Sequence, residues 1–161
     1  MSEIMIRQAV LADIENLYAL FSPVDQMHRE AHPEIFKQAD YPEEIKDYYR
    51  ACIRDQSSVI IIAISNNKVI GGVVCSLETA PEVPILVPRT VACIENIAVS
   101  QSYRKKGVGR LLVEAVQEWA SLRDATAIEL TVWEFNQDAA RFYNELGFQP
   151  YRRRMVKTLD G

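Results

Sequence analysis

The sequence has few cysteines, and none of them forms a recognisable pair. Cys52, Cys75 and Cys93 are the only three in 161 residues, and no CxxC spacing occurs. An odd number of widely separated cysteines argues against a disulfide framework and against a thiolate metal site. Unpaired cysteines of this kind fit a reducing compartment, so we expect a cytoplasmic protein.

Long apolar stretches are also lacking. The longest uninterrupted one, Val59 to Ile64, is far shorter than the roughly 20 residues needed to cross a bilayer. Residues 1–7 show no basic start followed by an apolar core, so we expect neither a signal peptide nor association with a membrane.

An overall positive charge is missing as well. The net charge is −4, which argues against a general nucleic-acid binder. The run YRRRMVK, residues 151–157, is better explained by arginines on an exposed or edge strand than by an RNA site. The charge is uneven: residues 1–60 hold 11 acids and 6 bases, and the remainder holds 11 acids and 12 bases. An acidic front half and a basic turn further on indicate two ligands of opposite charge.

Histidine is rare, which limits metal chemistry. His28 and His32 are the only two, and Glu30 does not stand where an HExxH site needs it. Pro33 disfavours helical geometry at His32, and no third ligand is near in sequence. We therefore predict no metal site, and we interpret this segment as a loop on the substrate side.

The hydrophobic patterns that are present predict one α/β domain over residues 1–161. Period-2 or continuous apolar runs indicate strands, and period-3.6 stripes indicate helices. Asn66-Asn67 favours a hairpin turn, and Gly71-Gly72 favours a bulge or a close backbone approach. The predicted order is strand 4–7, a helix from 14 ended by Ser22-Pro23, helix 42–54, strands 57–65 and 69–77, a loop over 79–89, strand 92–99, helix 108–119, strand 127–133, a helix between Asn136 and Gly147, and one or two strands in 148–159. Such an order implies a mixed sheet with helices on both faces.

The most informative stretch is the turn Arg104-Lys105-Lys106-Gly107-Val108-Gly109. It leads directly into an amphipathic helix, whose first N–H groups have no acceptor inside the helix and carry partial positive charge. Glycines allow close approach of an anion, so the turn predicts a phosphate cradle. The alternative is a strand-to-helix turn beside a solvated basic patch. Neither GxxxxGK[ST] nor GxGxxG occurs, so the turn is neither a P-loop nor a dinucleotide fingerprint.

Two segments resemble the GNAT superfamily of acyl-CoA-dependent N-acyltransferases. The hexapeptide at 104–109 is similar to the family's Q/R-x-x-G-x-G/A signature, within IAVSQSYRKKGVGRLL (97–112). ELTVWEFNQDAARFYNELGF (129–148) resembles the family's next strand and helix. The resemblance implies the GNAT fold: a central mixed, mostly antiparallel sheet of six to seven strands, about four helices on both faces, and a cleft where the fourth and fifth strands splay apart.

The resemblance also implies a cofactor site. Acetyl-CoA would enter the cleft as co-substrate, with its pantetheine arm beside the fourth strand like an added strand. The residues expected to contact acetyl-CoA are Ile97, Ala98, Val99, Arg104, Lys105, Lys106, Gly107, Val108, Gly109, Arg110 and Asn136. Asn136 is in addition expected to cap its helix.

Two residues are candidates for catalysis. Tyr143 matches the family position of a general acid that protonates the leaving thiolate, the alternative being a core aromatic. Glu95 is the candidate base, since strand alternation would place it on one face with Ile97 and Val99. The alternatives for Glu95 are that water takes the proton, or that the carboxylate holds a cationic substrate.

We therefore expect an N-acetyltransferase that moves an acetyl group from acetyl-CoA to a primary amine by direct attack on the thioester. The acidic front half suits a cationic acceptor, whose site we expect within residues 25–47. A small amine, a protein N-terminus or a lysine all fit, and the resemblance allows a homodimer. The alternatives are an acyl-CoA-binding module without catalysis and a nucleotide-binding fold that uses the same turn.

Overall fold

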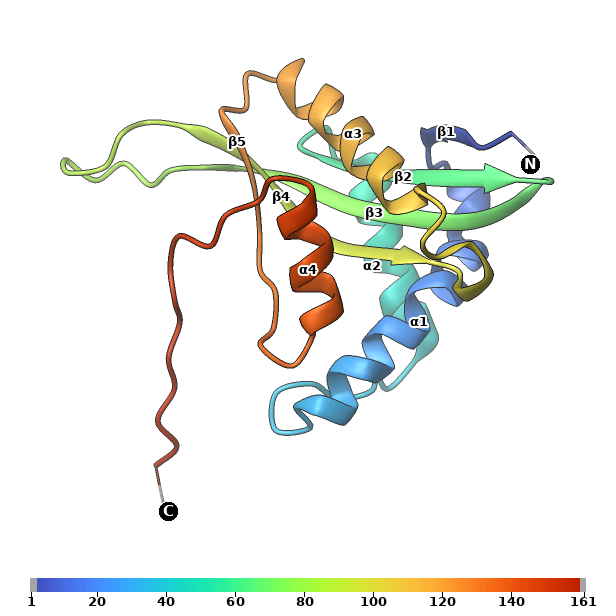
Figure 1. Cartoon of the computed structure of the whole chain (residues 1–161), viewed down its shortest axis with the longest axis horizontal. Helices are drawn as coiled ribbons and strands as arrows, with labels where there is room; N and C mark the ends of the chain where they lie inside the picture. Colours follow the sequence, from blue (N-terminus) through green and yellow to red (C-terminus); the bar gives the residue numbers. More distant parts are fainter. Residues whose placement is uncertain (1–2, 160–161) are drawn as a thin grey trace. The chain divides into compact units, whose positions relative to one another are not determined.

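The computed structural model describes residues 3–159, which form two compact units, 3–131 and 132–159. The first unit contains a five-stranded sheet in the order β1-β2-β3-β4-β5. Its elements are β1 (Met5–Gln8), α1 (Ile14–Ala31), α2 (Pro42–Arg54), β2 (Ser58–Ser65), β3 (Lys68–Thr79), β4 (Thr90–Val99), α3 (Val108–Ser121) and β5 (Ala127–Leu130), with one-turn 3-10 helices at Leu11–Asp13 and Gln101–Tyr103 (Figure 1). Among the described residues, no helix has both the length and the apolar composition that a membrane span requires.

The sheet is mixed and mostly antiparallel, as the sequence predicted. Strands β1 to β4 pair antiparallel, and β4 pairs with β5 in parallel. The expected six to seven strands are wrong, because residues 3–159 contain five. Residues 148–159 form no strand, since extended backbone needs a hydrogen-bonded neighbour to become one. The arginines of this segment are exposed, as predicted, but so are all of residues 149–159.

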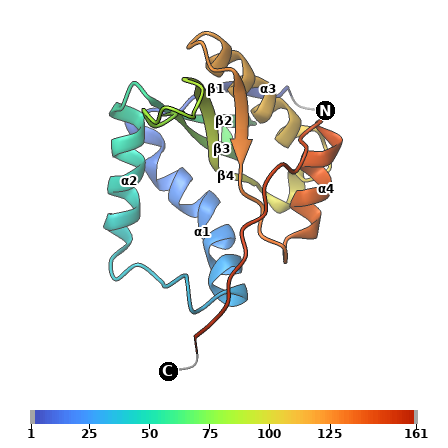
Figure 2. The same ribbon diagram turned by 90° about the vertical axis from the view of Figure 1, so that its left-hand side faces the viewer.

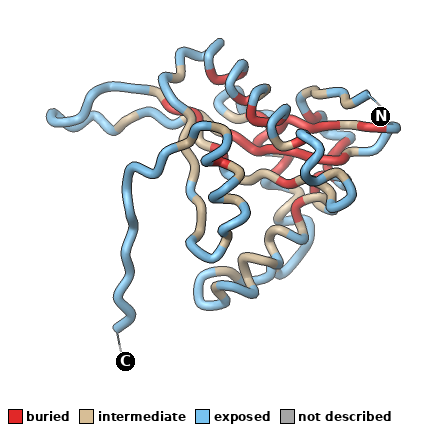
Figure 3. Tube along the Cα trace, in the orientation of Figure 1, coloured by how far each residue is buried: buried red, intermediate tan, exposed pale blue. Residues whose placement is uncertain are grey.

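Helices cover both faces of the sheet in the first unit. Figures 1 and 2 show α3 on one face and α1 with α2 on the other. The central strands β2, β3 and β4 carry most of the buried residues (Figure 3). Two apolar layers therefore hold β4, and the turn that follows it, against rigid neighbours.

Helix α1 is longer than the sequence predicted. Ser22-Pro23 was expected to end it, but it continues through Pro23 to Ala31. Pro23 points outward, while Phe21 is fully buried and Val24 packs against the same core. Packing of this apolar stripe on the core thus outweighs the loss of the one N–H donor at Pro23, and the helix continues.

Gly71 and Gly72 let helices approach β3 from both faces. A methyl group added at Gly71 would lie 3.0 Å from Val108 Cγ1 of α3, and one added at Gly72 would lie 3.0 Å from Leu20 Cδ2 of α1. The register also shifts at this point, because Ala63 pairs with Gly71 while Ile64 pairs with Val69. The sequence had left a bulge and a close approach as alternatives, and both are present.

The second unit consists of α4 (Gln137–Glu145) and the segment around it. The Asn136 side chain accepts a hydrogen bond from the Ala139 N–H at 3.2 Å, which confirms the predicted cap. Gly147 ends the helix with φ +91°, and the Phe148 N–H bonds back to the Tyr143 carbonyl at 3.0 Å. This pattern, with Phe148 packed on Tyr143, is the Schellman ending that a C′ glycine favours.

We predict that Gly71→Ala destabilises the protein by about 1–3 kcal/mol, because the added methyl group overpacks the contact between β3 and α3. Urea unfolding measures the change. Lys68→Ala is the matched control on the same strand, and we expect it to stay within about 0.5 kcal/mol, since Lys68 is exposed. Equal midpoints for the two variants would contradict the close packing.

Candidate active site

Strand β4 has a partner on its outer side along only half of its length. Its parallel pairing with β5 runs from Val91 opposite Ala127 to Ile94 opposite Leu130 and then ends. Among residues 3–159, no strand pairs with the outer edge of β4 after Ile94. The predicted parting of the fourth and fifth strands is present, and it leaves backbone groups of β4 available on that edge.

A bulge lies at the point where the two strands part. On the inner side of β4, Cys75 pairs with Ile94 and Val74 pairs with Asn96, so Glu95 has no partner in β3. An extra residue of this kind bends the strand and increases its local twist. The bulge thus coincides with the end of the pairing, since β5 ends at Leu130 opposite Ile94.

Beyond the bulge, successive residues of β4 direct their backbone N–H and C=O groups alternately toward β3 and toward the outer edge. The Ser100 N–H bonds to the Ile70 carbonyl at 2.8 Å, so Ser100 faces β3. In an antiparallel ladder the hydrogen-bonding groups alternate, so Ala98 also faces β3, while Ile97 and Val99 face the free edge. The Val99 carbonyl accepts a hydrogen bond from Arg104 Nε at 3.1 Å, which agrees with its pointing away from β3. The free edge is therefore offered by Ile97 and Val99.

The turn after β4 has the backbone that the cradle hypothesis requires. Gly107 adopts φ +84°, and a Cβ added there would meet nothing within 4 Å. The first bond of α3 runs from the Leu111 N–H to the Gly107 carbonyl at 3.1 Å. The N–H groups of Val108, Gly109 and Arg110 thus have no acceptor inside the helix. Open space next to three such N–H groups fits a phosphate.

Cationic side chains surround this turn, and all four of them are exposed: Arg104, Lys105, Lys106 and Arg110. Arg104 folds back through its Nε onto Val99, and Lys106 Nζ lies 5.4 Å from the centre of the Tyr103 ring. The backbone of Lys105 is also in the left-handed region, with φ +59°. The positive charge therefore adds attraction for an anion, while the shape of the turn is set by the backbone.

Glu95 lies on the opposite face of β4 from the one that strand alternation predicted. Its carboxylate accepts a hydrogen bond from the Tyr48 hydroxyl of α2. Val99 is paired with Gly71, whose face is covered by α3, whereas Ala98 is paired with Gly72, whose face is covered by α1. Glu95 is thus on the α1–α2 face, and Ile97 and Val99 direct their side chains to the α3 face. The expectation of a shared face was wrong because the bulge adds one residue to the count.

Tyr48 is the site residue that sequence reasoning missed. It lies 47 positions before Glu95 in the chain, so no local pattern connects the two. The available signal was an aromatic pair, Tyr48-Tyr49, in a helix that needs only one of them for the core: Tyr49 is 3% exposed and packs on Phe21, while Tyr48 is 44% exposed. Burial, and next the bond to Glu95, raise the pKa of Tyr48, so its hydroxyl remains a donor at neutral pH.

The second unit carries the other two predicted residues. Asn136 is the cap of α4, and Tyr143 lies in its last turn. The Tyr143 ring contacts Phe142 and Phe148, with ring centres 5.1 and 5.5 Å away. Burial raises the pKa of Tyr143 to about 12. A phenol with that pKa keeps its proton throughout the neutral range and can donate it.

The remaining reactive groups have local roles. Burial raises the pKa of Cys75 and that of Cys93 to about 12, so both thiols stay protonated. His28 Nδ1 lies 2.8 Å from the Val24 carbonyl, and His32 Nδ1 lies 2.9 Å from Glu34. Within residues 3–159, no three metal-binding side chains gather in one place.

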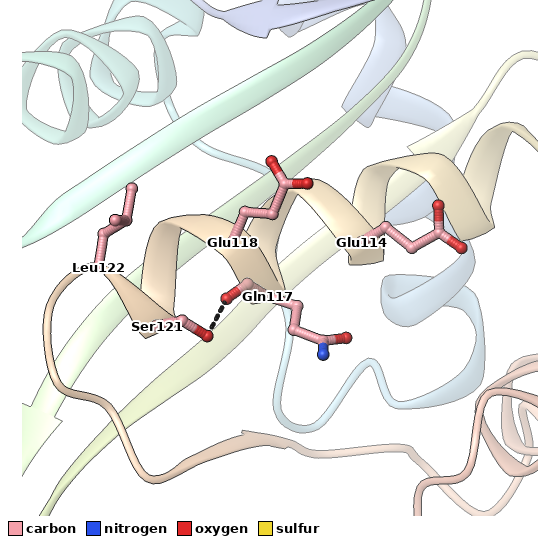
Figure 4. Close-up of a pocket in the computed structure, with 5 residues that line it drawn as sticks. All are labelled: Glu114, Gln117, Glu118, Ser121 and Leu122. Carbon is pink, nitrogen blue, oxygen red and sulfur yellow. Dashed lines mark hydrogen bonds between the residues drawn. The ribbon is translucent and has the colours of Figure 1, made fainter.

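Two hollows occur elsewhere in the first unit. One is a shallow depression along α3, bordered by Glu114, Gln117, Glu118, Ser121 and Leu122 (Figure 4). The other, of about 320 Å³, lies between α1 and the start of α2, where Asp25, Arg29 and Gln38 contribute to its lining. Burial raises the pKa of Asp25, and the nearby Arg29 and His28 oppose that effect. The second hollow overlaps residues 25–47, where the sequence predicted an acceptor, and is also lined by residues of α1 that precede them.

Several proteins with a similar sequence or structure are N-acetyltransferases. An uncharacterised N-acetyltransferase of Methanocaldococcus jannaschii is 31% identical over 96 residues, which is 60% of this chain but only 41% of that protein. The crystal structure of a mutant of the BH1408 protein from Bacillus halodurans superimposes with a TM-score of 0.90 at 27% identity, covering 96% of this chain and 99% of the other. An aminoglycoside N-acetyltransferase in complex with CoA shares the fold at 19% identity and a TM-score of 0.78, covering 99% and 96%.

The family model described as the Acetyltransferase (GNAT) family matches residues 21–148. The matched segment holds the bulged β4, the glycine turn, α3, and the capped helix α4. It thus contains every residue that the sequence had singled out for cofactor binding and catalysis. The chain belongs to the GNAT family of acetyltransferases.

Proposed function

We propose that this protein transfers an acetyl group from acetyl-CoA to a primary amine. The observation that carries the proposal is the continuity of two features, the unpaired edge of β4 and the left-handed turn at Gly107. The edge ends at Val99, and the turn begins five residues later at Arg104, which binds the Val99 carbonyl. One extended ligand with an amide-bearing arm and a phosphate end matches that order of groups.

The residues present fit CoA at both ends. The outward N–H and C=O groups of Ile97 pair with an amide-containing arm in the way that an added strand would. The free N–H groups of Val108, Gly109 and Arg110 suit the pyrophosphate, with Lys105 and Lys106 adding attraction. Ala98 turns its backbone groups toward β3, so we assign it no contact through them. Asn136, besides its cap, remains a proposed contact.

Three groups share the proposed chemistry. Acetyl-CoA supplies the activated acyl group when it is bound. Glu95 receives the proton that the attacking amine must lose, directly or through water, and its negative charge also attracts a cationic amine. Tyr143 donates a proton to the leaving thiolate, and its raised pKa means that this proton is still in place at neutral pH.

The acceptor is proposed only by its charge. Residues 1–60 carry five more acids than bases, and Glu95 faces the helices that this segment forms. A cationic amine is therefore favoured. A cytoplasmic location, where acetyl-CoA and reduced cysteines coexist, fits the three unpaired thiols and remains part of the proposal.

We predict that isothermal calorimetry detects selective micromolar binding of acetyl-CoA, with ATP and NAD much weaker. Gly107→Ala should weaken acetyl-CoA binding about tenfold, because left-handed backbone costs alanine roughly 1–2 kcal/mol and the turn must change shape. Asn67→Ala is the matched control, since Asn67 is also left-handed (φ +59°) but belongs to the β2–β3 hairpin. Failure of wild type to bind acetyl-CoA would reject the proposed function.

We also predict that Tyr143→Phe lowers kcat by about 100-fold, because it removes the proton donor and preserves the ring contacts. Release of free CoA in the presence of a panel of amines measures turnover, and calorimetry should give an unchanged Kd for acetyl-CoA. An unchanged kcat would exclude Tyr143 as the acid. Tight acetyl-CoA binding by wild type without turnover on any amine would favour the acyl-CoA-binding module.

A further inference from the structure

We propose that Tyr48 is a positioning residue, which holds the Glu95 carboxylate in place on the α1–α2 face of the sheet for the acceptor amine. This inference rests on the proposed function, because it concerns the group that receives the proton of the amine. It is carried by one contact, the hydrogen bond from the Tyr48 hydroxyl of α2 to Glu95 Oε2 of β4.

Glu95 needs such an anchor because of where it lies. It is exposed, and the bulge leaves its backbone without a partner in β3. An exposed glutamate on a bent strand has several rotamers of similar energy, so a bond from a neighbouring helix is needed to select one. Within residues 3–159, the side chain that donates such a bond to Glu95 is that of Tyr48.

Tyr48 is itself held firmly enough to act as an anchor. Its ring packs on Tyr49 with ring centres 5.6 Å apart, and Tyr49 packs on the fully buried Phe21 at 5.7 Å. The Cys52 thiol, one turn further along α2, also interacts with the Tyr48 hydroxyl. The position of Glu95 is therefore coupled through rings to the core between α1 and the sheet.

The other titratable groups near Glu95 are thiols, and they belong to Cys52 on α2, Cys75 on β3 and Cys93 on β4. Burial is the main cause that raises the pKa of each thiol, so all three are neutral between pH 5 and pH 8. None of them therefore carries a charge that would draw the carboxylate away from the Tyr48 hydroxyl.

The test compares Tyr48→Phe with Tyr49→Phe. The first variant removes the hydroxyl that binds Glu95, and the second removes the hydroxyl of the adjacent residue, whose ring packs on Phe21 in the core. We expect Tyr48→Phe to lower kcat about tenfold without changing the KM for acetyl-CoA, and Tyr49→Phe to leave kcat within twofold. In the Glu95→Gln background, Tyr48→Phe should have no further effect on kcat, because it acts through Glu95.

The comparison of kcat with KM separates positioning from a structural role. A variant that disturbs the fold should change kcat and the KM for acetyl-CoA together, whereas Tyr48→Phe should change kcat alone. Equal effects of Tyr48→Phe and Tyr49→Phe on kcat, or a kcat unchanged in Tyr48→Phe, would overturn the assignment.

Urea unfolding gives a readout that needs no activity. The midpoint shifts caused by Tyr48→Phe and Glu95→Gln should be non-additive, whereas those of Tyr49→Phe and Glu95→Gln should add. Additive shifts for the first pair would overturn the assignment whether or not the protein turns over. If wild type binds no acetyl-CoA and releases no CoA, the proposed function fails and the positioning role fails with it, while the urea cycle still decides the bond by itself.

Discussion

The site depends on the interruption of a single hydrogen-bonded ladder. A strand inside a sheet normally forms hydrogen bonds with a neighbouring strand along both edges, and β4 does so only as far as Ile94. The extra residue at position 95 bends the strand where the pairing with β5 ends, while its inner edge stays paired with β3 to Val99. An extended ligand with amide groups requires a strand that is rigidly supported on one edge and has backbone N–H and C=O groups without a strand partner on the other.

Much of the arrangement could be read from the sequence, because it rests on local chemistry. A glycine turn at 107–109 leading into a helix, Asn136 as a cap and Gly147 as a helix end each follow from the conformational needs of one or two residues. The apolar stripe of α3 and the buried run in β2 follow from periodicity. These features place the glycine turn between a strand and a helix without knowledge of the fold.

The features that escaped prediction are all tertiary. The bulge depends on how β4 pairs with β3, and the bond from Tyr48 to Glu95 depends on α2 lying over that bulge. Helix α1 passes Pro23 because the buried Phe21 before it and the partly buried Val24 after it pack on the core. Residues 148–159 have strand-like composition, but composition does not provide a pairing partner. In each case contact between distant segments overrides the local signal.

The bulge has a consequence for how the protein tolerates change. The feature resides in the number of residues between Ile94 and Asn96, and hardly in the identity of the one between them. Scanning by substitution keeps that number and would leave the bend in place. Loss of the residue between them would join Ile94 to Asn96 in regular pairing, so that the later residues keep their partners in β3 but the bend disappears. The chain should therefore accept varied side chains in this strand far more readily than a changed length.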